Sequence, residues 1–482
     1  MLAVAHVLGL LLASFALTYA LPIGCALLLG DGRWTRFLLA AAITTAVGLV
    51  LATATAHGRR ELKPRDGFLL VTLGWLLLSC SAALPLLLAV PGLDFNGAFF
   101  EAMSGLTTTG STVLTGLDQL PPSLNLWRHT LHWIGGLGII IMALAVLPLL
   151  GVGGMQLYKG QAPGAVKDER LAPRITETAK QLWVVYTLIT AAGILALRIC
   201  HMTWFDAICH AFSAVGLGGF STHDRSIAYF NSPAIELVLM ALMVIAALNF
   251  GRHIIALRRL SLATYRQDPE AKAIFAILAA SVIGIASLLT AHGVYADFLP
   301  ALRYAAFNVI SQATTSGLTS EDYQRWPVFA PWWMLFLTCI VCSTGSTGGG
   351  IKMFRTLLLA RQAGREMQLL IHPAAVAPLR IGGRPIPESV GSSVLAFIFV
   401  YFMTVALLTF AMLLTGMSFA DAASAVVASI NNTAHGFGAP GAVHNFHSLS
   451  TVQIWICTAA MLLGRLEVFS VIVLFRPAYW RR

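Results

Sequence analysis

The stretch TTTGSTV at residues 107–113 places a glycine among hydroxyl residues, between two long apolar segments. Irregular backbone at membrane depth survives only where it is buried in protein or lines a water-filled cavity. The chain returns to this construction at three further places, which read VGLGGFST at 215–222, ATTSGLT at 313–319 and NNTAHGFG at 431–438. We call these four segments glycine loops 1 to 4.

The four loops recur with a period near one hundred residues. The aligned glycines are Gly110, Gly219, Gly317 and Gly436, with separations of 109, 98 and 119 residues. A serine lies six residues upstream in loops 1 to 3 and seven upstream in loop 4, which predicts a one-residue insertion there. Four incomplete copies of one unit predict a fourfold arrangement around an axis. Carbonyls converging on that axis would form a cation filter, because their oxygens can replace an ion's water shell.

The composition is that of a membrane protein. Of 482 residues, 57% are hydrophobic and only 11% are charged, compared with about 25% charged residues in soluble domains. Residues 2–29 are apolar, follow no Lys or Arg, and are too long for a signal-peptide core, so we expect them to remain as a transmembrane helix. The pair Cys339 and Cys342 lies inside an apolar run, which favours buried thiols over a zinc or redox site.

Ten apolar segments are long enough to cross a membrane. They lie near residues 2–29, 37–56, 67–90, 124–150, 180–200, 233–257, 272–292, 328–351, 390–415 and 451–475. The sequence therefore predicts an all-α polytopic membrane protein, with two N-terminal helices and four repeats of helix, re-entrant pore loop and helix around a pseudo-fourfold pore. The expected units are residues 1–66, 67–159, 160–260, 261–388 and 389–482.

Basic residues predict the orientation of the chain. Of 31 Lys and Arg residues, 23 lie in alternate connections, at residues 57–66, 151–180, 251–272, 352–388 and 476–482. We expect these connections and both termini in the cytoplasm, with the glycine loops opening outward. The net charge of +10 is then a topology signal and does not indicate nucleic-acid binding. The connections on the opposite face hold few Lys or Arg and several Asp and Glu residues, which would concentrate cations at the outer mouth.

Three further features have competing interpretations. The segment STGSTGGGIK at 343–352 interrupts the eighth span, and it lacks the G-K-[ST] ending of a phosphate loop. It is interpreted as a mobile gate that lines the pore, with a static kink as the alternative. Arg465 in the last span would place a positive charge beneath loop 4, unless it is simply paired with helix carbonyls. Helix N-caps are expected at Asp94 or Asn96 and at Asp206.

The histidines give no catalytic pattern. His129 and His132, like His444 and His447, have H-x-x-H spacing without a third ligand nearby, and both pairs are expected at the edges of outer loops. Interface histidines are the favoured interpretation. A membrane-embedded enzyme that uses them is retained as the alternative from a different functional class.

The glycine loops, the glycine-broken span and the Arg in the last helix together resemble the Trk/Ktr/HKT superfamily of potassium transporters. With two extra N-terminal helices, the chain is most similar to the bacterial Trk-type membrane subunits. The resemblance covers nearly all of the chain, including HWIGGLGIIIMALAVLPLLGVGGMQLYKGQAPGAVKDERLAPRITETAKQLW at 132–183. It implies potassium uptake across the bacterial inner membrane, and Gly110 in the first loop argues for potassium over sodium. A sodium or mixed-cation conductor of the same fold remains the alternative.

The resemblance also implies site residues and partners. The potassium filter would consist of Thr108, Thr109, Gly110, Leu217, Gly218, Gly219, Thr315, Ser316, Gly317, Asn432, Thr433, Ala434, His435 and Gly436. The gate would consist of Ser343, Thr344, Gly345, Ser346, Thr347, Gly348, Gly349, Gly350 and Arg465. Potassium is the transported ion, and no cofactor is expected in this chain. The implied partners are membrane lipid, a second copy of the chain, and a cytosolic ring of TrkA-like subunits that bind NAD(H), ATP or ADP.

The chain departs from the family pattern in two loops. Loop 4 has Ala434 and His435 where a Gly-Pro pair is common, and loop 3 has Leu318 where Phe is common. A histidine facing the mouth would make conductance depend on pH. The sequence does not decide whether His435 faces the mouth or is turned away.

Overall fold

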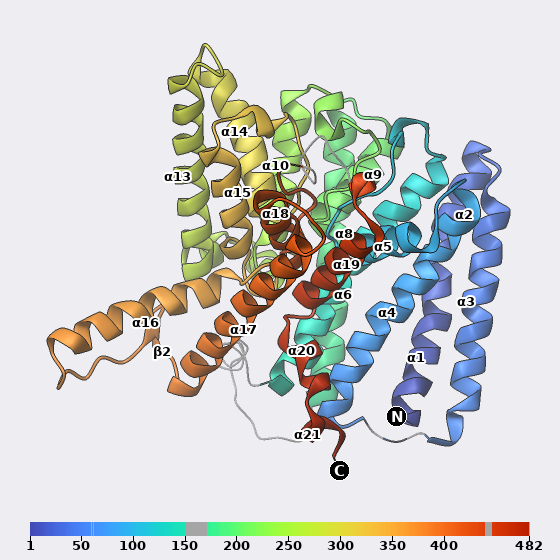
Figure 1. Ribbon diagram of the computed structural model, residues 1–482, viewed down its shortest axis with the longest axis horizontal. Helices are drawn as coiled ribbons and strands as arrows, with labels where there is room; N and C mark the ends of the chain where they lie inside the picture. The colour runs from blue at the N-terminus through green and yellow to red at the C-terminus, as the bar shows by residue number, and fades with distance from the viewer. Residues whose placement is uncertain (59, 61, 151–170, 439–445, 482) are drawn as a thin grey trace.

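The computed structural model describes residues 1–58, 60, 62–150, 171–438 and 446–481, and nearly all of their regular structure is helical (Figure 1). Helices suit an apolar chain of this kind because each backbone N–H is paired within its own segment. Within the described residues the strands are the two-residue pair β1 (Arg380–Ile381) and β2 (Arg384–Pro385), which are antiparallel. The prediction of an all-α fold is confirmed.

The N-terminal addition consists of two long helical segments. The first is α1 (Leu2–Phe15), which continues through the 3-10 turn Ala16–Tyr19 into α2 (Ala20–Leu29). Gly30, with φ of +67°, ends α2 in the left-handed conformation. The second segment, α3 (Trp34–Ala54), packs along α1.

The rest of the chain repeats one pattern four times, with a long helix, a short helix ending in a glycine loop, and a further helix. The first two repeats are α4 (Pro64–Ala89), α5 (Phe95–Leu106) and α6 (Pro122–Leu150), then α8 (Leu171–Ile199), α9 (Trp204–Gly216) and α10 (Pro233–Ala247). The last two are α13 (Pro269–Ala291), α14 (Phe298–Ala313) and α15 (Phe329–Ile340), then α17 (Glu388–Leu413), α18 (Phe419–Ile430) and α19 (Thr451–Arg465).

Contacts between repeats close the four units into a ring. Within each repeat the long first helix packs on the short helix, as α4 does on α5 and α17 on α18. The last helix of each repeat then contacts the short helix of the next: α6 meets α9, α10 meets α14, and α15 meets α18. The ring closes where α19 contacts α5. The short helices therefore occupy the centre, as the fourfold prediction requires.

Several of the predicted spans are broken. Helix α10 is followed after a bend of 103° by α11 (Phe250–Arg259), and α19 is followed after a bend of 102° by α20 (Phe469–Ile472) and the 3-10 turn Val473–Phe475. Among the described residues, six helices are long and apolar enough to cross a membrane, or eight if each bent pair is one span. The count of ten stays a prediction.

The remaining α-helices lie between and after the repeats. They are α12 (Ala263–Arg266), the long α16 (Met353–Ile371) and α21 (Pro477–Trp480). Helix α16 follows the interrupted span and extends away from the bundle together with the β1–β2 hairpin (Figure 1).

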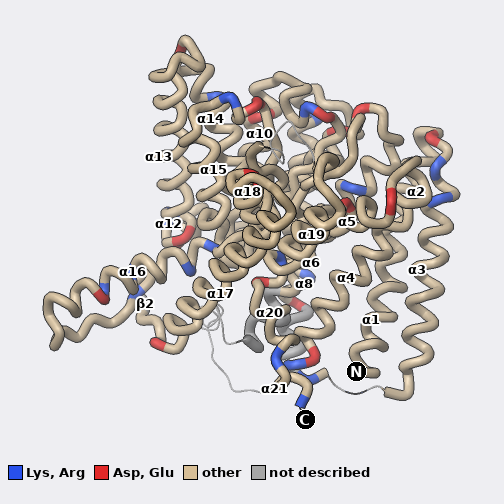
Figure 2. Tube along the Cα trace, in the orientation of Figure 1, with Lys and Arg blue, Asp and Glu red and all other residues tan. Residues whose placement is uncertain are grey.

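The exposed surface of the long helices is apolar. On α17, Phe399 is 66% exposed and Phe410 is 63% exposed, and α3 exposes Val50 at 67%. Large apolar side chains standing outward over whole helices indicate a lipid environment. Both chain ends lie at the same end of the molecule (Figure 1), where Figure 2 shows Lys and Arg around α21.

Candidate functional site

Each short helix ends with the same backbone hydrogen bond into its glycine loop. The N–H of Thr109 donates to the carbonyl of Ser104 over 2.8 Å, and that of Gly218 donates to Ser213 over 2.9 Å. The equivalent bonds in loops 3 and 4 join Ser316 to Ser311 and Thr433 to Ala428, both over 2.9 Å. This shared bond sets the register in which the four loops correspond.

The loops also share an unusual backbone conformation. One residue before each of these donors the backbone is left-handed, at Thr108 (φ +52°), Leu217 (+55°), Thr315 (+63°) and Asn432 (+54°). Left-handed backbone costs a residue with a side chain about 1–2 kcal/mol, so it persists where the surrounding structure enforces it. Strained backbone of this kind is concentrated at ligand sites, and here it recurs at four equivalent positions.

Glycine is required in loops 1 to 3 because neighbouring loops approach so closely. Gly110, Gly219 and Gly317 have φ of +83°, +87° and +79°. A methyl group on Gly110 would collide with the carbonyl oxygen of Gly218, and one on Gly219 would collide with that of Ser316. Backbone carbonyls of one loop thus lie against the glycine of the loop before it, around the centre of the ring.

In loop 4, the residue that corresponds to Gly110, Gly219 and Gly317 lies two positions earlier in the chain than the sequence alignment predicted. In loops 1 to 3 the glycine comes one residue after the hydrogen-bond donor, and in loop 4 that position is Ala434. The predicted alignment of Gly436 is therefore wrong. A methyl on Gly436 would lie 2.6 Å from the hydroxyl of Ser424 on its own short helix, away from the other loops. No insertion is present, because Ala428 occupies the place of the upstream serine.

A buried ion pair, which the sequence analysis missed, ties loops 1 and 2 together. Glu101 on α5 and Arg128 on α6 are both 0% exposed, and Arg128 Nε donates to Glu101 over 2.7 Å. The same carboxylate accepts bonds from Thr112 Oγ1 and from the N–H of Val113 in loop 1. The guanidinium stacks on the ring of Phe220 in loop 2, 4.1 Å from its centre. The available signal was a lone acid and a lone base within otherwise apolar helices.

The glycine-rich segment 343–350 packs directly on the ring. The N–H of Gly349 donates to Thr315 Oγ1 in loop 3 over 3.0 Å, and Thr347 Oγ1 donates to the carbonyl of Val215 over 3.0 Å. A methyl on Gly349 would collide with the carbonyl oxygen of Asn431 in loop 4. The segment therefore contacts three of the four loops.

The same segment is also joined to the break between α10 and α11. The N–H of Ser343 donates to the carbonyl of Ala247, and the N–H of Phe250 donates to the carbonyl of Gly345. Glu270 at the start of α13 accepts bonds from Ser343 Oγ over 2.8 Å and from the N–H of Thr344 over 2.9 Å. A movement of the segment would therefore also move the break between α10 and α11 and the start of α13.

Arg465 is the last residue of α19 and is 2% exposed. Its guanidinium donates to the carbonyl of Thr347 in the glycine-rich segment and to that of Gly135 on α6, both over 2.9 Å. The bond to Gly135 is a contact with a helix carbonyl, as the alternative interpretation expected, and the bond to Thr347 joins the Arg to the segment interpreted as the gate. Glu467 forms its ion pair with Arg355 on α16.

The first of the two predicted histidine pairs lies elsewhere than predicted. His129 and His132 are on α6 and 0% exposed, so their expected place at an outer loop edge is wrong. His129 Nδ1 contacts the carbonyl of Asn125 at 2.7 Å, and His132 stacks on Phe220 with ring centres 4.1 Å apart. Among the described residues no three His, Cys, Asp or Glu side chains are grouped to hold a metal. His444 lies outside the described residues.

The two predicted N-caps have different outcomes. Asp94 is the N-cap of α5 and accepts a bond from the N–H of Gly97 over 2.8 Å, as expected. The N-cap of α9 is Thr203, whose hydroxyl accepts from the N–H of Asp206, so Asp206 lies in the first turn. In both helices the capped end points away from the ring.

A cavity of about 280 Å³ adjoins the ring of glycine loops. Its walls include Gly110, Gly219 and His435. Near its rim, His223 Nδ1 lies 2.5 Å from Asp118, and His223 Nε2 lies 3.6 Å from Asp206. His223, which directly follows loop 2, thus contacts one carboxylate on α9 and one in the segment after loop 1.

Stability is expected to fall as the pH rises above about 6.5. Burial disfavours the imidazolium of His223, but the carboxylates of Asp206 and Asp118 outweigh it and raise the pKa of His223. Between the ordinary and the raised pKa, the folded protein holds a proton that the unfolded chain releases, so increasing pH destabilises the fold. Thermal unfolding between pH 6 and 9 should show this decline, and His223→Gln should flatten it. An identical slope in the variant would contradict the assignment.

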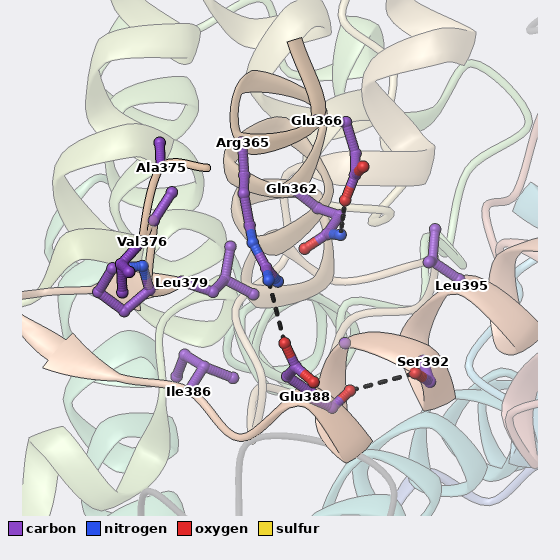
Figure 3. A pocket seen from close by; sticks show the side chains of 13 residues that line it. Gln362, Arg365, Glu366, Ala375, Val376, Leu379, Ile386, Glu388, Ser392 and Leu395 are labelled. Atoms are coloured by element: carbon purple, nitrogen blue, oxygen red, sulfur yellow. Dashed lines mark hydrogen bonds and ion pairs between the residues drawn. The ribbon is translucent and has the colours of Figure 1, made fainter. Parts of the chain in front are cut away.

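Another cavity, of about 570 Å³, lies between α16, residues 375–379 and the start of α17 (Figure 3). Arg365 on α16 donates to Glu388 on α17 over 3.0 Å across it. None of the predicted filter or gate residues lines this cavity. The ring, and not this cavity, is therefore the candidate site.

Known proteins of one kind match the whole chain. A family model named TrkH and described as "Cation transport protein" matches residues 34–482. The chain is 44% identical over 480 residues to the Trk system potassium uptake protein TrkH of Halomonas elongata, covering 99% of this chain and 98% of the relative. It is 42% identical to the TrkH of Escherichia coli K12, with 99% of both chains covered.

The fold has a close match among solved structures. The crystal structure of the potassium transporter TrkH from Vibrio parahaemolyticus superposes with a TM-score of 0.91 at 38% sequence identity. The match covers 100% of this chain and 99% of that chain. The predicted resemblance to Trk-type membrane subunits is confirmed.

Proposed function

Since this chain belongs to the TrkH family of cation transport proteins, we propose that it takes up potassium through a filter of backbone carbonyls at the ring of glycine loops. Membership of this family confirms the prediction of a transport protein rather than an enzyme. The relatives named above are potassium uptake proteins, which supports potassium as the ion.

One observation carries the proposal. Four loops from four repeats adopt the same left-handed backbone at the centre of the fold, where Gly110 and Gly219 each lie against a backbone carbonyl of the next loop. Carbonyl oxygens at such a position can replace the hydration shell of a cation without any charged side chain. The half-negative C-terminal ends of the four short helices point toward the same place and add to the attraction.

The gate in this proposal is the glycine-rich segment together with Arg465. The segment lies against three loops and is hydrogen-bonded to Arg465 through Thr347. A fixed positive charge beside a cation pathway opposes entry of the ion. Because Arg465 is bonded to the carbonyl of Thr347, a movement of the segment would also shift the guanidinium. Glycines at 348–350 make such a rearrangement inexpensive.

The surroundings of the protein are part of the proposal. We place the chain in the bacterial inner membrane with both termini in the cytoplasm, because basic residues cluster in one set of connections. A homodimer and a separate cytosolic nucleotide-binding ring are the partners that the family resemblance implies.

Gly110→Ser is expected to lower the preference for potassium over sodium by about tenfold, or about 1.4 kcal/mol. The added side chain collides with the carbonyl oxygen of Gly218, so that oxygen must move from its place beside the pathway. The measurement is uptake of potassium and sodium into vesicles that contain the purified protein and its cytosolic partner.

Gly116→Ser is the matched control for this test. Gly116 has φ of +70°, so it carries comparable backbone strain, but an added Cβ there meets no atom within 4 Å. It should leave the ion preference unchanged. If wild-type protein passes sodium as readily as potassium, the sodium or mixed-cation alternative replaces this proposal.

A further inference from the structure

One member of the ring carries a side chain where the other three have none. Ala434 stands in the place of the fourth glycine, and it does not adopt the left-handed φ of the others. Its Cβ lies 3.0 Å from the position of a methyl group built on Gly110, 2.8 Å from one on Gly219 and 2.5 Å from one on Gly317. A single methyl group this close to all three positions stands where the loops converge.

We propose that Ala434 is a specificity-determining residue, whose methyl group narrows the ring and sets the largest cation that passes. The inference rests on the proposed function and adds to it the ion size that the filter accepts. It concerns one side chain, whereas the filter itself is built from backbone carbonyls.

The methyl group is held firmly in this position. Ala434 is 0% exposed, and its carbonyl oxygen accepts a bond from Ser111 Oγ in loop 1 over 3.0 Å. The preceding residues are fixed as well, because Asn432 Nδ2 donates to Thr109 Oγ1 and to the carbonyl of Met461, both over 3.0 Å. Loop 4 is therefore anchored to loop 1 and to α19, and the methyl cannot turn aside without breaking these bonds.

A methyl at this point acts on ions according to their size. It offers no lone pair to a cation, and it occupies space that a larger ion and its oxygen ligands would need. Ions larger than potassium are therefore disfavoured more strongly than potassium itself. A change in folding or in the amount of inserted protein would instead scale the passage of all ions equally.

The test compares Ala434→Gly with wild type for uptake of potassium and rubidium into vesicles containing the cytosolic partner. We expect potassium uptake to rise by about tenfold, which corresponds to about 1.4 kcal/mol, and rubidium uptake to rise further, so that the rubidium-to-potassium ratio increases. Ala425→Gly is the matched control. It makes the same change at a buried position of α18, outside the ring, and should leave the ratio unchanged.

A second measurement does not depend on the gate. The measurement is the rise in the thermal unfolding midpoint of the detergent-solubilised protein when potassium or rubidium is added. In wild type we expect the larger rise with potassium, and in Ala434→Gly we expect a smaller difference between the two ions. The inference is overturned if Ala434→Gly takes up potassium with the same rubidium-to-potassium ratio as wild type and shows the same preference for potassium in thermal protection. The proposed function would then still stand. Absence of potassium uptake and of potassium protection from both proteins would overturn the proposed function, and the inference with it.

Discussion

Glu101→Gln is expected to lower the free energy of unfolding by about 3–5 kcal/mol, the usual cost of breaking a buried ion pair by removing one partner. The substitution leaves the guanidinium of Arg128, 0% exposed, without a carboxylate. Loop 1 also loses a charged acceptor for Thr112 Oγ1 and for the N–H of Val113. The measurement is the thermal unfolding midpoint of the purified protein, together with its potassium uptake.

Two comparisons make this prediction specific. Glu388→Gln breaks the pair with Arg365, but Glu388 is 81% exposed at its side chain, so we expect a loss below about 1 kcal/mol. The double variant Glu101→Gln with Arg128→Met removes both charges and should recover part of the stability. Equal losses for the buried and the exposed pair would show that Glu101 does not stabilise loop 1.

Arg465→Ala is expected to raise potassium uptake about thirtyfold. A unit charge about 8 Å from an ion, in an effective dielectric of about 20, raises its energy by about 2 kcal/mol, and this barrier disappears with the guanidinium. The bonds to the carbonyls of Thr347 and Gly135 are lost as well, which frees the glycine-rich segment. Initial uptake rates into vesicles, normalised to the amount of inserted protein, give the measurement.

Arg465→Lys is the control that separates charge from packing. It keeps the positive charge but has a single ammonium in place of the fork that reaches both carbonyls. Uptake should therefore stay close to wild type in this variant. Reduced uptake in well-folded Arg465→Ala protein would assign Arg465 a structural role and remove it from the gate.

Much of the fold could be predicted because its signals are local. Apolar segments of about 20 residues give the membrane class, and the period of the glycine loops gives the four repeats that the contacts from α19 to α5 close into a ring. Gly110, Gly219 and Gly317 could be placed because each needs a positive φ and space that only glycine allows.

Other parts of the site depend on partners that are distant in the chain. Arg128 and Glu101 are 27 residues apart, and Arg465 and Gly135 are 330 apart, so no local pattern shows that they meet. His129 and His132 were expected at the edge of an outer loop. The packing of α6 against α9 buries them instead.

Loop 4 shows most clearly where sequence reasoning ends and tertiary structure begins. The existence of a fourth loop could be predicted from the sequence, because the apolar segments around it repeat those around the other three. The sequence could not determine which residue enters the ring, since the glycine at 436 matched the pattern better than the alanine at 434. That choice is made by hydrogen bonds from Thr433 to Ala428 and from Ser111 to Ala434. Only the assembled ring brings loop 1 and loop 4 close enough to form the second bond, and Ala434 is thereby held at the centre.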